Sequence, residues 1–279
     1  MPELPEVETI RRGLEQYLVG KRFISIDVRD RKIFVGDEKK LLNAAIISIE
    51  RKAKGLLFNL ENNVTLAGHL RMTGQFIYED KVVSKGILFK KLLPVPSKFT
   101  RVIFLLDNGA KLFYNDVRRF SWMKVVATNM ISSLPFFSAL GPEPFVDLTE
   151  AQLHAITLNS KRVIKTLLMD QRKIAGLGNI YANDALFAAG IHPNRKAKTL
   201  IKQETAKLHK AILRVLSRGI EFSGATEINF VNVLGQSGTY QNHFLVYHRA
   251  GKPCVRCKTL IKKIRLGGRG TYICEVCQT

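Results

Sequence analysis

The sequence predicts an α+β protein with an amino-terminal helix, an antiparallel β-sandwich, a helical region and a small carboxy-terminal finger. Three observations support this prediction. Apolar residues alternate with polar ones through much of the first 128 residues, as they do in half-buried strands. After about residue 149 the apolar period becomes helical, and all four cysteines fall within the last 26 residues.

One helix and the β-sandwich are expected in the first 128 residues. Four apolar residues mark one face of an amphipathic helix ending near Gly20, namely Val7, Ile10, Leu14 and Leu18. Alternation then predicts strands at 24–28, 46–50, 56–60, 64–70, 101–106, 111–114 and 122–127. Asp107-Asn108-Gly109 separates two of these runs and is a hairpin signal, which favours antiparallel pairing.

The second half of the chain is expected to be helical and to end in the finger. Leu140-Gly141-Pro142-Glu143-Pro144 interrupts the strand pattern and indicates an interdomain linker. Helices are predicted at 149–158, 161–169, 179–189 and 199–218, followed by a long polar loop at 219–243. The predicted domains are 1–128 for the β-sandwich, 129–146 for the linker, 147–243 for the helical domain and 244–279 for the finger. Residues 81–101 carry six cations and no acid, which indicates a mobile basic loop, although a simple solvated loop is the favoured alternative.

The charge of the chain points to a polyanionic partner. Lysine and arginine number 44 against 23 acidic residues, a formal net charge of +21. Nucleic acid is the commonest such partner, although charge alone leaves an anionic membrane or a ribosome open. No apolar run reaches the roughly 18 residues of a membrane helix, and Glu3, Glu6 and Glu8 stand where a signal peptide would be basic. We therefore expect a cytoplasmic protein with no membrane contact.

The four cysteines have the spacing of a structural metal site. Cys254 and Cys257 form one C-x2-C pair, and Cys274 and Cys277 form a second pair after sixteen residues. Two such turns bring four thiolates to one tetrahedral Zn²⁺ ion. Two short disulfides are the alternative, which an intracellular chain does not favour. Between the first and last of these cysteines the finger carries six cations that suit phosphate contact, namely Arg256, Lys258, Lys262, Lys263, Arg265 and Arg269.

Pro2 is a candidate nucleophile once Met1 has been removed, because its nitrogen is then a free secondary amine. An α-amino group has a reference pKa near 7.7–8.0, against about 10.4 for lysine, so far more of it is neutral at pH 7. Attack on a sugar C1′ gives an iminium with a fixed positive charge, which permits strand elimination. Glu3 is a candidate proton donor to the ring oxygen, and Glu6 lies one turn along. Taken alone, these residues favour an ordinary helix start.

The whole chain resembles the formamidopyrimidine-DNA glycosylases, whose motifs occur here in the same order. They are Met1-Pro2-Glu3-Leu4-Pro5-Glu6-Val7-Glu8-Thr9, Arg51-Lys52-Ala53-Lys54-Gly55, His69-Leu70-Arg71-Met72-Thr73-Gly74, Asp116-Val117-Arg118-Arg119-Phe120, Leu140-Gly141-Pro142-Glu143-Pro144, Gly178-Asn179-Ile180-Tyr181-Ala182 and the four cysteines. The resemblance implies a β-sandwich, a helix-two-turns-helix module and a finger holding one structural Zn²⁺. It implies a monomeric base-excision repair enzyme, without a nucleotide cofactor, that acts on damaged double-stranded DNA.

The resemblance also implies the reaction and the residues that carry it. The enzyme would release 8-oxoguanine and formamidopyrimidines through a Schiff base at Pro2, and would then cleave the strand by β,δ-elimination. Pro2 would be the nucleophile and Glu3 the proton donor, with Lys54 and Arg269 as cations at the DNA backbone. The implied DNA contacts are Glu6, His69, Met72, Arg118, Phe120 and Asn179. Among these, Met72, Arg118 and Phe120 match the wedge that fills the space left by a flipped nucleotide.

Two rival functions remain open, and the sequence departs from the family pattern at a few positions. An endonuclease VIII-like enzyme would share the fold but prefer oxidised pyrimidines; Leu4 and the purine-type wedge argue against it. A zinc-stabilised DNA-binding protein without activity is the second rival. The departures fall at Phe99-Thr100-Arg101-Val102, at Tyr247-His248-Arg249 and at Ala225 in the expected base-capping loop, 223–230.

Overall fold

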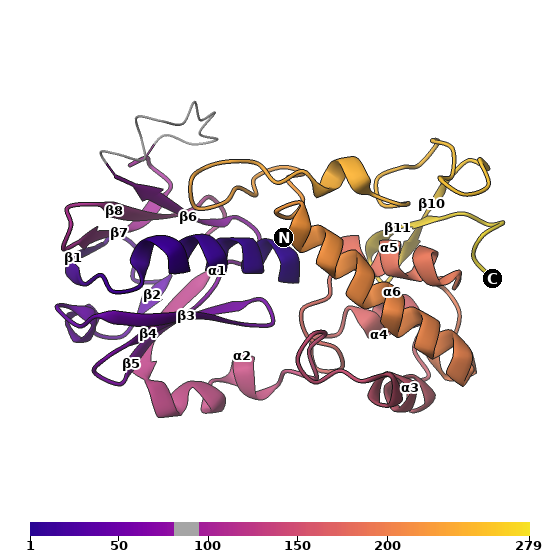
Figure 1. The fold of residues 1–279 in the computed structure, drawn as a ribbon, viewed down its shortest axis with the longest axis horizontal. Helices are drawn as coiled ribbons and strands as arrows, with labels where there is room; N and C mark the ends of the chain where they lie inside the picture. Colours follow the sequence, from indigo (N-terminus) through magenta and orange to yellow (C-terminus); the bar gives the residue numbers. More distant parts are fainter. Residues whose placement is uncertain (81–94) are drawn as a thin grey trace. The chain divides into compact units, whose positions relative to one another are not determined.

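A computed structural model of the chain describes residues 1–80 and 95–279, which divide into two compact units. The first unit comprises Met1–Ser138 and Phe222–Thr239, and the second comprises Ala139–Glu221 and Tyr240–Thr279 (Figure 1). The basic loop predicted at 81–101 lies for its greater part, residues 81–94, outside the described residues. Among the residues that are described, no helix is both long and apolar enough to cross a membrane.

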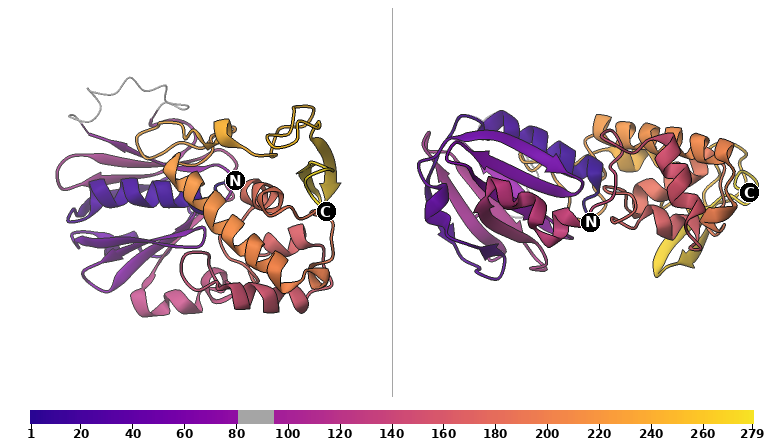
Figure 2. Two further views of the ribbon diagram at one scale, coloured as in Figure 1. Left: turned by 45° about the vertical axis from the view of Figure 1, so that its right-hand side comes forward. Right: turned by 90° about the horizontal axis from the view of Figure 1, so that it is seen from below.

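The first unit begins with helix α1, Leu4–Leu18, as the apolar period predicts. A capping box starts the helix: the Glu3 side chain accepts from the backbone of Glu6, and the Glu6 side chain accepts from the backbone of Glu3. The predicted apolar face is buried against both sheets of the unit. In two views α1 lies along the open side between these sheets (Figures 1 and 2).

Two sheets form the β-sandwich of the first unit. One sheet has the order β1-β7-β8-β6, with strands Phe23–Val28, Thr100–Leu106, Lys111–Asp116 and Gly74–Glu79. The other has the order β2-β9-β5-β4-β3, with strands Phe34–Val35, Trp122–Ala127, Val64–His69, Gly55–Leu60 and Ile46–Lys52. Every neighbouring pair is antiparallel except β2 with β9. Aromatic pairs such as Phe58 with Phe76 join the two sheets in the core.

Strand β6, Gly74–Glu79, is not predicted by the sequence pattern, and the structure gives the reason. Its first five residues are all buried, so apolar and polar residues do not alternate along it. The segment 222–239 covers its outer face: the backbone N–H of Tyr78 donates to the carbonyl of Val233 at 2.7 Å, and Ile77 packs against Val231. A strand buried on both faces loses the period-2 signal.

The second unit contains the predicted helices and the finger hairpin. Its helices are α3 Glu150–Leu158, α4 Ile164–Leu168, α5 Asn179–Ala189 and α6 Lys202–Glu221, and its strands are β10 Lys262–Leu266 and β11 Arg269–Ile273. The helix predicted from 161 starts at Ile164. The helix predicted from 199 starts at Lys202, because Ala197–Thr199 forms a separate 3₁₀ turn before it. The second unit also has the short turn η5 Tyr240–His243, and the short elements of the first unit are η1 Glu38–Leu41, η3 Thr128–Ser133 and α2 Pro135–Ser138.

The region predicted as a polar loop at 219–243 is more ordered and more buried than expected. Helix α6 continues to Glu221, and Ala225, Phe230, Val231 and Val233 are buried in the first unit. The mixed α+β architecture predicted from the sequence is confirmed.

Candidate functional site

The start of α1 is a buried polar cluster in the first unit. Pro2, Glu3 and Glu6 are all buried. One oxygen of the Glu6 carboxylate accepts from the Glu3 backbone N–H, and the other accepts from the Ala225 backbone N–H, each at 2.8 Å. Gly224 has φ +78°, and a Cβ there would lie 2.9 Å from the Glu6 Cγ. Glu6 therefore ties the segment 222–239 to the first residues of the helix.

Lys54 and His69 lie close together in the second sheet, Lys54 in a turn and His69 at the end of strand β5. Lys54 belongs to the β3–β4 turn and is 3% exposed, and its neighbour Gly55 pairs with His69 in the sheet. Burial, with the positive charges of Arg71 and Lys54, lowers the pKa of His69 to about 3. The ring is therefore neutral at pH 7. Because Nδ1 accepts from the Arg71 backbone N–H at 2.9 Å, the ring proton lies on Nε2, which leaves His69 a single N–H donor.

The three predicted wedge residues lie on two loops of the first unit. Met72 is half-buried in the turn between β5 and β6, whereas Arg118 and Phe120 are exposed in the loop after β8. The guanidinium carbon of Arg118 lies 4.6 Å from the centre of the Phe120 ring, and Phe120 is 55% exposed. An exposed phenylalanine that is stacked on an arginine suits contact with a base step better than it suits a core position.

Asp116 joins these two loops, although sequence reasoning assigned it no role. Its buried carboxylate accepts from the Thr73 hydroxyl and the Arg118 backbone N–H on one oxygen. The other oxygen accepts from the backbone N–H and the hydroxyl of Ser121 at 3.0 and 2.6 Å. Burial raises the pKa of Asp116, but hydrogen bonds from Ser121 and Thr73 outweigh it and hold the pKa below the usual 3.8.

Replacing Asp116 by asparagine is expected to lower the free energy of unfolding by about 1–3 kcal/mol at pH 7, because one amide oxygen cannot accept from four donors. A lowered pKa stabilises the fold at pH values above the ordinary pKa. The difference between wild type and variant should therefore shrink as the pH falls below 3.8 through the lowered pKa. Urea unfolding at pH 7, 5 and 3 measures it. A difference that grew towards acid pH would contradict this account.

In the second unit, Asn179 and Arg269 come from distant parts of the sequence and lie next to one another. Asn179 is the first residue of α5, and its side-chain amide donates to the carbonyl of Gly270 at 3.2 Å, one residue beyond Arg269. Asn179 also lines a groove of about 380 Å³ together with Lys263, Arg265, His248 and Tyr272. Arg269 is exposed at the start of β11. The groove therefore combines the cations Lys263 and Arg265 with the side-chain amide of Asn179 at a helix start, and such a surface is suited to phosphate.

Two buried polar residues that sequence reasoning missed hold the finger hairpin against the helices of the second unit. Lys165 is fully buried, and its Nζ donates to the Gly270 carbonyl at 2.8 Å and to the Thr271 hydroxyl at 2.7 Å. The Asn183 side chain accepts from the Tyr272 backbone N–H at 2.8 Å. A lone lysine or asparagine on a helix gives no sequence signal for such a role.

The four cysteines converge at the base of the finger. Their sulfur atoms all lie within 4.8 Å of one another, with Cys254 to Cys277 at 3.9 Å and Cys257 to Cys274 at 3.3 Å. Sulfurs of a tetrahedral zinc site lie roughly 3.8 Å apart, given a Zn–S length of about 2.3 Å. A disulfide would need about 2.05 Å, and the four cysteines are free. The residues therefore fit one Zn²⁺ held by four thiolates.

Arg256 departs from the phosphate-contact role expected of the finger's cations. Its guanidinium donates to the carbonyls of Phe187 and Ala188, at 3.1 and 2.8 Å, and lies 4.6 Å from the Phe187 ring. Both carbonyls belong to the last turn of α5, where side chains commonly complete the hydrogen bonding, and the Phe187 carbonyl also accepts from the Gly190 backbone N–H at 3.0 Å. Arg256 therefore anchors the finger to the helix.

Comparison with known proteins identifies the family. Three family models match the chain in order: the formamidopyrimidine-DNA glycosylase N-terminal domain at residues 1–123, its H2TH domain at 140–230, and a zinc finger found in this family and in IleRS at 251–279. The chain belongs to the formamidopyrimidine-DNA glycosylase family. It is 41% identical to the formamidopyrimidine-DNA glycosylase of Lactiplantibacillus plantarum, covering 99% of this chain and 98% of that one. A relative from Desulforamulus reducens is also 41% identical, covering 100% and 99%.

Solved structures of the formamidopyrimidine-DNA glycosylase family share the fold over the full length. The Lactococcus lactis enzyme, solved with abasic-site DNA, superposes with a TM-score of 0.88 at 33% identity and covers 100% of both chains. The enzyme from Thermus thermophilus gives 0.88 at 34% identity and covers 99% of this chain and 98% of its own. Family membership confirms the resemblance, the bifunctional glycosylase and lyase class, and the zinc finger predicted from the sequence.

Proposed function

We propose that this chain excises oxidised purines from duplex DNA and then cleaves the strand, with Pro2 as the nucleophile. The observation that carries this proposal is the buried start of α1, where Pro2 and Glu3 precede the helix in the same unit as the buried Lys54. Relatives support the substrate: the Lactococcus lactis enzyme was solved with DNA containing a formamidopyrimidine. The chain would act as a monomer without a nucleotide cofactor.

Pro2 and Glu3 carry the first bond changes of the proposed reaction. After removal of Met1, the neutral Pro2 nitrogen attacks the sugar C1′ and the bond to the purine breaks. The purine leaves with the bonding electron pair and takes up one proton, which balances the proton that the Pro2 nitrogen loses. Glu3 donates a proton to the ring oxygen as the ring opens, which leaves an iminium with a fixed positive charge. The charge acidifies the C2′ hydrogen, so its loss expels the 3′ phosphate, and a second elimination expels the 5′ phosphate.

The remaining residues hold and deform the DNA. Lys54 would bind the phosphate beside the damaged nucleotide, and His69 would donate its Nε2 proton to the backbone. Asn179 and Arg269 would grip phosphates from the second unit. Met72, Arg118 and Phe120 would occupy the space of the flipped nucleotide, which costs a few kcal/mol to extrude. Arg118 would pair with the orphaned base.

Substrate class is tested by comparing the release of 8-oxoguanine opposite cytosine with the release of thymine glycol. We expect faster release of 8-oxoguanine, because the wedge composition is that of the purine-specific enzymes. Single-turnover rates on two duplexes of the same sequence give the ratio. Faster release of thymine glycol would instead support the pyrimidine-specific alternative.

Activity itself is tested by borohydride trapping, which converts a Schiff base into a stable adduct. An 8-oxoguanine duplex should give a covalent protein–DNA product with wild type. The product should be lost in Pro2→Gly and in protein that retains Met1, whose Pro2 nitrogen is an amide. A DNA-binding protein without activity would give no adduct at all, even where it binds the duplex with normal affinity and salt dependence.

A further inference from the structure

We propose that Arg51 is a positioning residue that holds Lys54 in place by linking the backbone of the β3–β4 turn to Glu8 on α1. This inference rests on the role proposed above for Lys54 at the DNA backbone. Arg51 itself touches neither the DNA nor the reacting atoms in that scheme.

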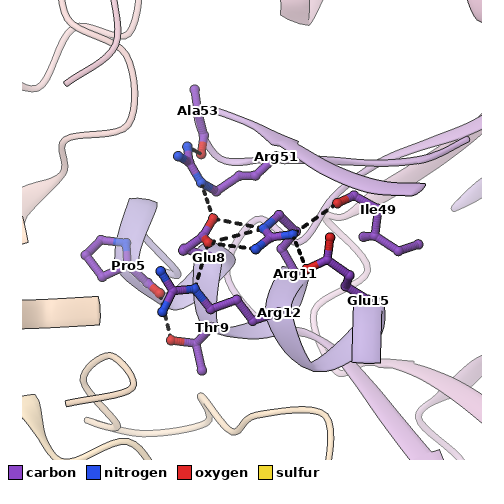
Figure 3. A network of polar contacts seen from close by, with 9 residues as sticks. All are labelled: Pro5, Glu8, Thr9, Arg11, Arg12, Glu15, Ile49, Arg51 and Ala53. Carbon is purple, nitrogen blue, oxygen red and sulfur yellow. Dashed lines mark hydrogen bonds and ion pairs between the residues drawn. The ribbon is translucent and has the colours of Figure 1, made fainter. Parts of the chain in front are cut away.

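Glu8 lies in the second turn of α1, and its carboxylate binds three arginines, two from the same helix and one from strand β3 (Figure 3). Its carboxylate accepts from Arg11 at 3.0 Å, from Arg12 at 2.9 Å and from Arg51 at 3.0 Å. The Glu8 and Arg51 side chains are only 12% and 10% exposed, whereas Arg12 is 60% exposed. Burial raises the pKa of Glu8, but the arginine hydrogen bonds outweigh it and keep the carboxylate ionised. Arg51 is thus a largely buried cation that is paired with the Glu8 carboxylate.

The other end of the Arg51 guanidinium reaches the turn that carries Lys54. Its Nη1 donates to the Ala53 carbonyl at 3.0 Å, while Nε is bound to Glu8 (Figure 3). Arg51 pairs with Leu56 and Lys52 pairs with Gly55, so Ala53 and Lys54 form a two-residue hairpin turn. The Ala53 carbonyl belongs to the peptide that leads into Lys54. A hydrogen bond to this oxygen therefore orients the peptide plane between Ala53 and Lys54, and with it the direction of the Lys54 side chain.

The turn needs such a restraint because its first central residue is not glycine. Ala53 has φ +55° and is fully buried. A left-handed conformation costs about 1–2 kcal/mol in an L-residue, and hairpin turns of this kind favour glycine at this position. The strained conformation persists only while its surroundings hold it. The bond from Arg51 supplies one such contact, and it orients the peptide before Lys54.

A double-mutant cycle tests the proposal. The variants are Arg51→Met, Lys54→Met and the double variant, with the single-turnover rate of 8-oxoguanine release as the readout. We expect Arg51→Met to slow release about tenfold and Lys54→Met to slow it more. The double variant should be no slower than Lys54→Met alone, because Arg51 acts only through Lys54.

A matched control separates positioning from general stability. Arg12→Met removes another partner of Glu8, but Arg12 is mostly exposed and does not bond to Ala53, so its rate should stay within twofold of wild type. Arg51→Lys keeps the positive charge but loses the forked donors that bind Glu8 and Ala53 together. If Arg51→Met folds poorly, Arg51→Lys takes its place in the cycle, and we expect the same loss of about tenfold in the rate of release. Urea unfolding of every variant verifies the fold.

The outcomes distinguish this inference from the proposed function. Losses that multiply in the double variant, or equal losses in Arg12→Met and Arg51→Met, would overturn the positioning role and leave the proposed function intact. An unchanged rate in Lys54→Met would overturn the role of Lys54 and the inference with it. A double variant equal to Lys54→Met supports both.

Discussion

Removal of zinc by chelation, or replacement of Cys274 by serine, is expected to unfold the finger and to weaken binding to duplex DNA on the order of 100-fold. Apart from the metal site, the finger is a two-stranded hairpin, β10 with β11, and such hairpins are marginally stable on their own. Binding of structural zinc supplies apparent free energies of about 10–16 kcal/mol, and in small zinc domains this is folding energy. The finger carries Lys263, Arg265 and Arg269, each of which would contact phosphate.

The loss has a second signature in the salt dependence of binding. Each phosphate contact contributes about 0.9 to the slope of log affinity against log salt, so loss of the finger cations should lower the slope by about two to three. Metal analysis should give one zinc per chain for wild type and none for Cys274→Ser. Val276→Ser, at a 62% exposed position between the last two cysteines, is the matched control and should keep its zinc. Full affinity in the metal-free protein would contradict this role of the finger.

Glu3→Gln is expected to slow base release by about 100- to 10,000-fold, the range of general acid catalysis. The same change should slow cleavage at a preformed abasic site much less. An abasic sugar already exists partly as the open-chain aldehyde, which needs no proton on the ring oxygen. Glutamine keeps a side-chain oxygen for the capping box at the start of α1, so the helix should remain intact.

Two substrates in one experiment separate the roles of Glu3. Single-turnover rates are measured on an 8-oxoguanine duplex and on an abasic duplex of the same sequence. Glu15→Gln changes a half-exposed glutamate at the far end of the same helix and should leave both rates unchanged. Equal losses on the two substrates would mean that Glu3 maintains the structure of the site, not that it donates the proton.

Sequence reasoning succeeds where the signal is local. The apolar face of α1, the helical period over 199–218 and the paired cysteines are each set by neighbours a few residues away, and the structure confirms these elements. The strand Gly74–Glu79 is missed because a segment some 150 residues further along the chain buries its second face. No periodicity within the strand reports that contact.

In the candidate site, too, local features can be predicted from the sequence and long-range contacts cannot. Pro2 and Glu3 are found by their chemistry and by motif, but the contacts of Glu6 with Ala225 and of Arg51 with Glu8 exist only in the folded chain. Asp116 lies inside a motif quoted for its neighbours, yet its four donors come from three places in the sequence. The residues that orient a site are therefore harder to predict than those that react, because their partners are set by the tertiary fold.

The identity of the attacking nitrogen is the central claim, and peptide mapping of the borohydride-trapped adduct tests it most directly. The adduct formed with an 8-oxoguanine duplex is digested with protease and nuclease, and the modified peptide is sequenced by mass spectrometry. We predict that the peptide lacks Met1 and carries the reduced sugar on the nitrogen of Pro2. A sugar attached to Lys54 or to any other side chain, or an adduct on a peptide that retains Met1, would contradict the proposed mechanism.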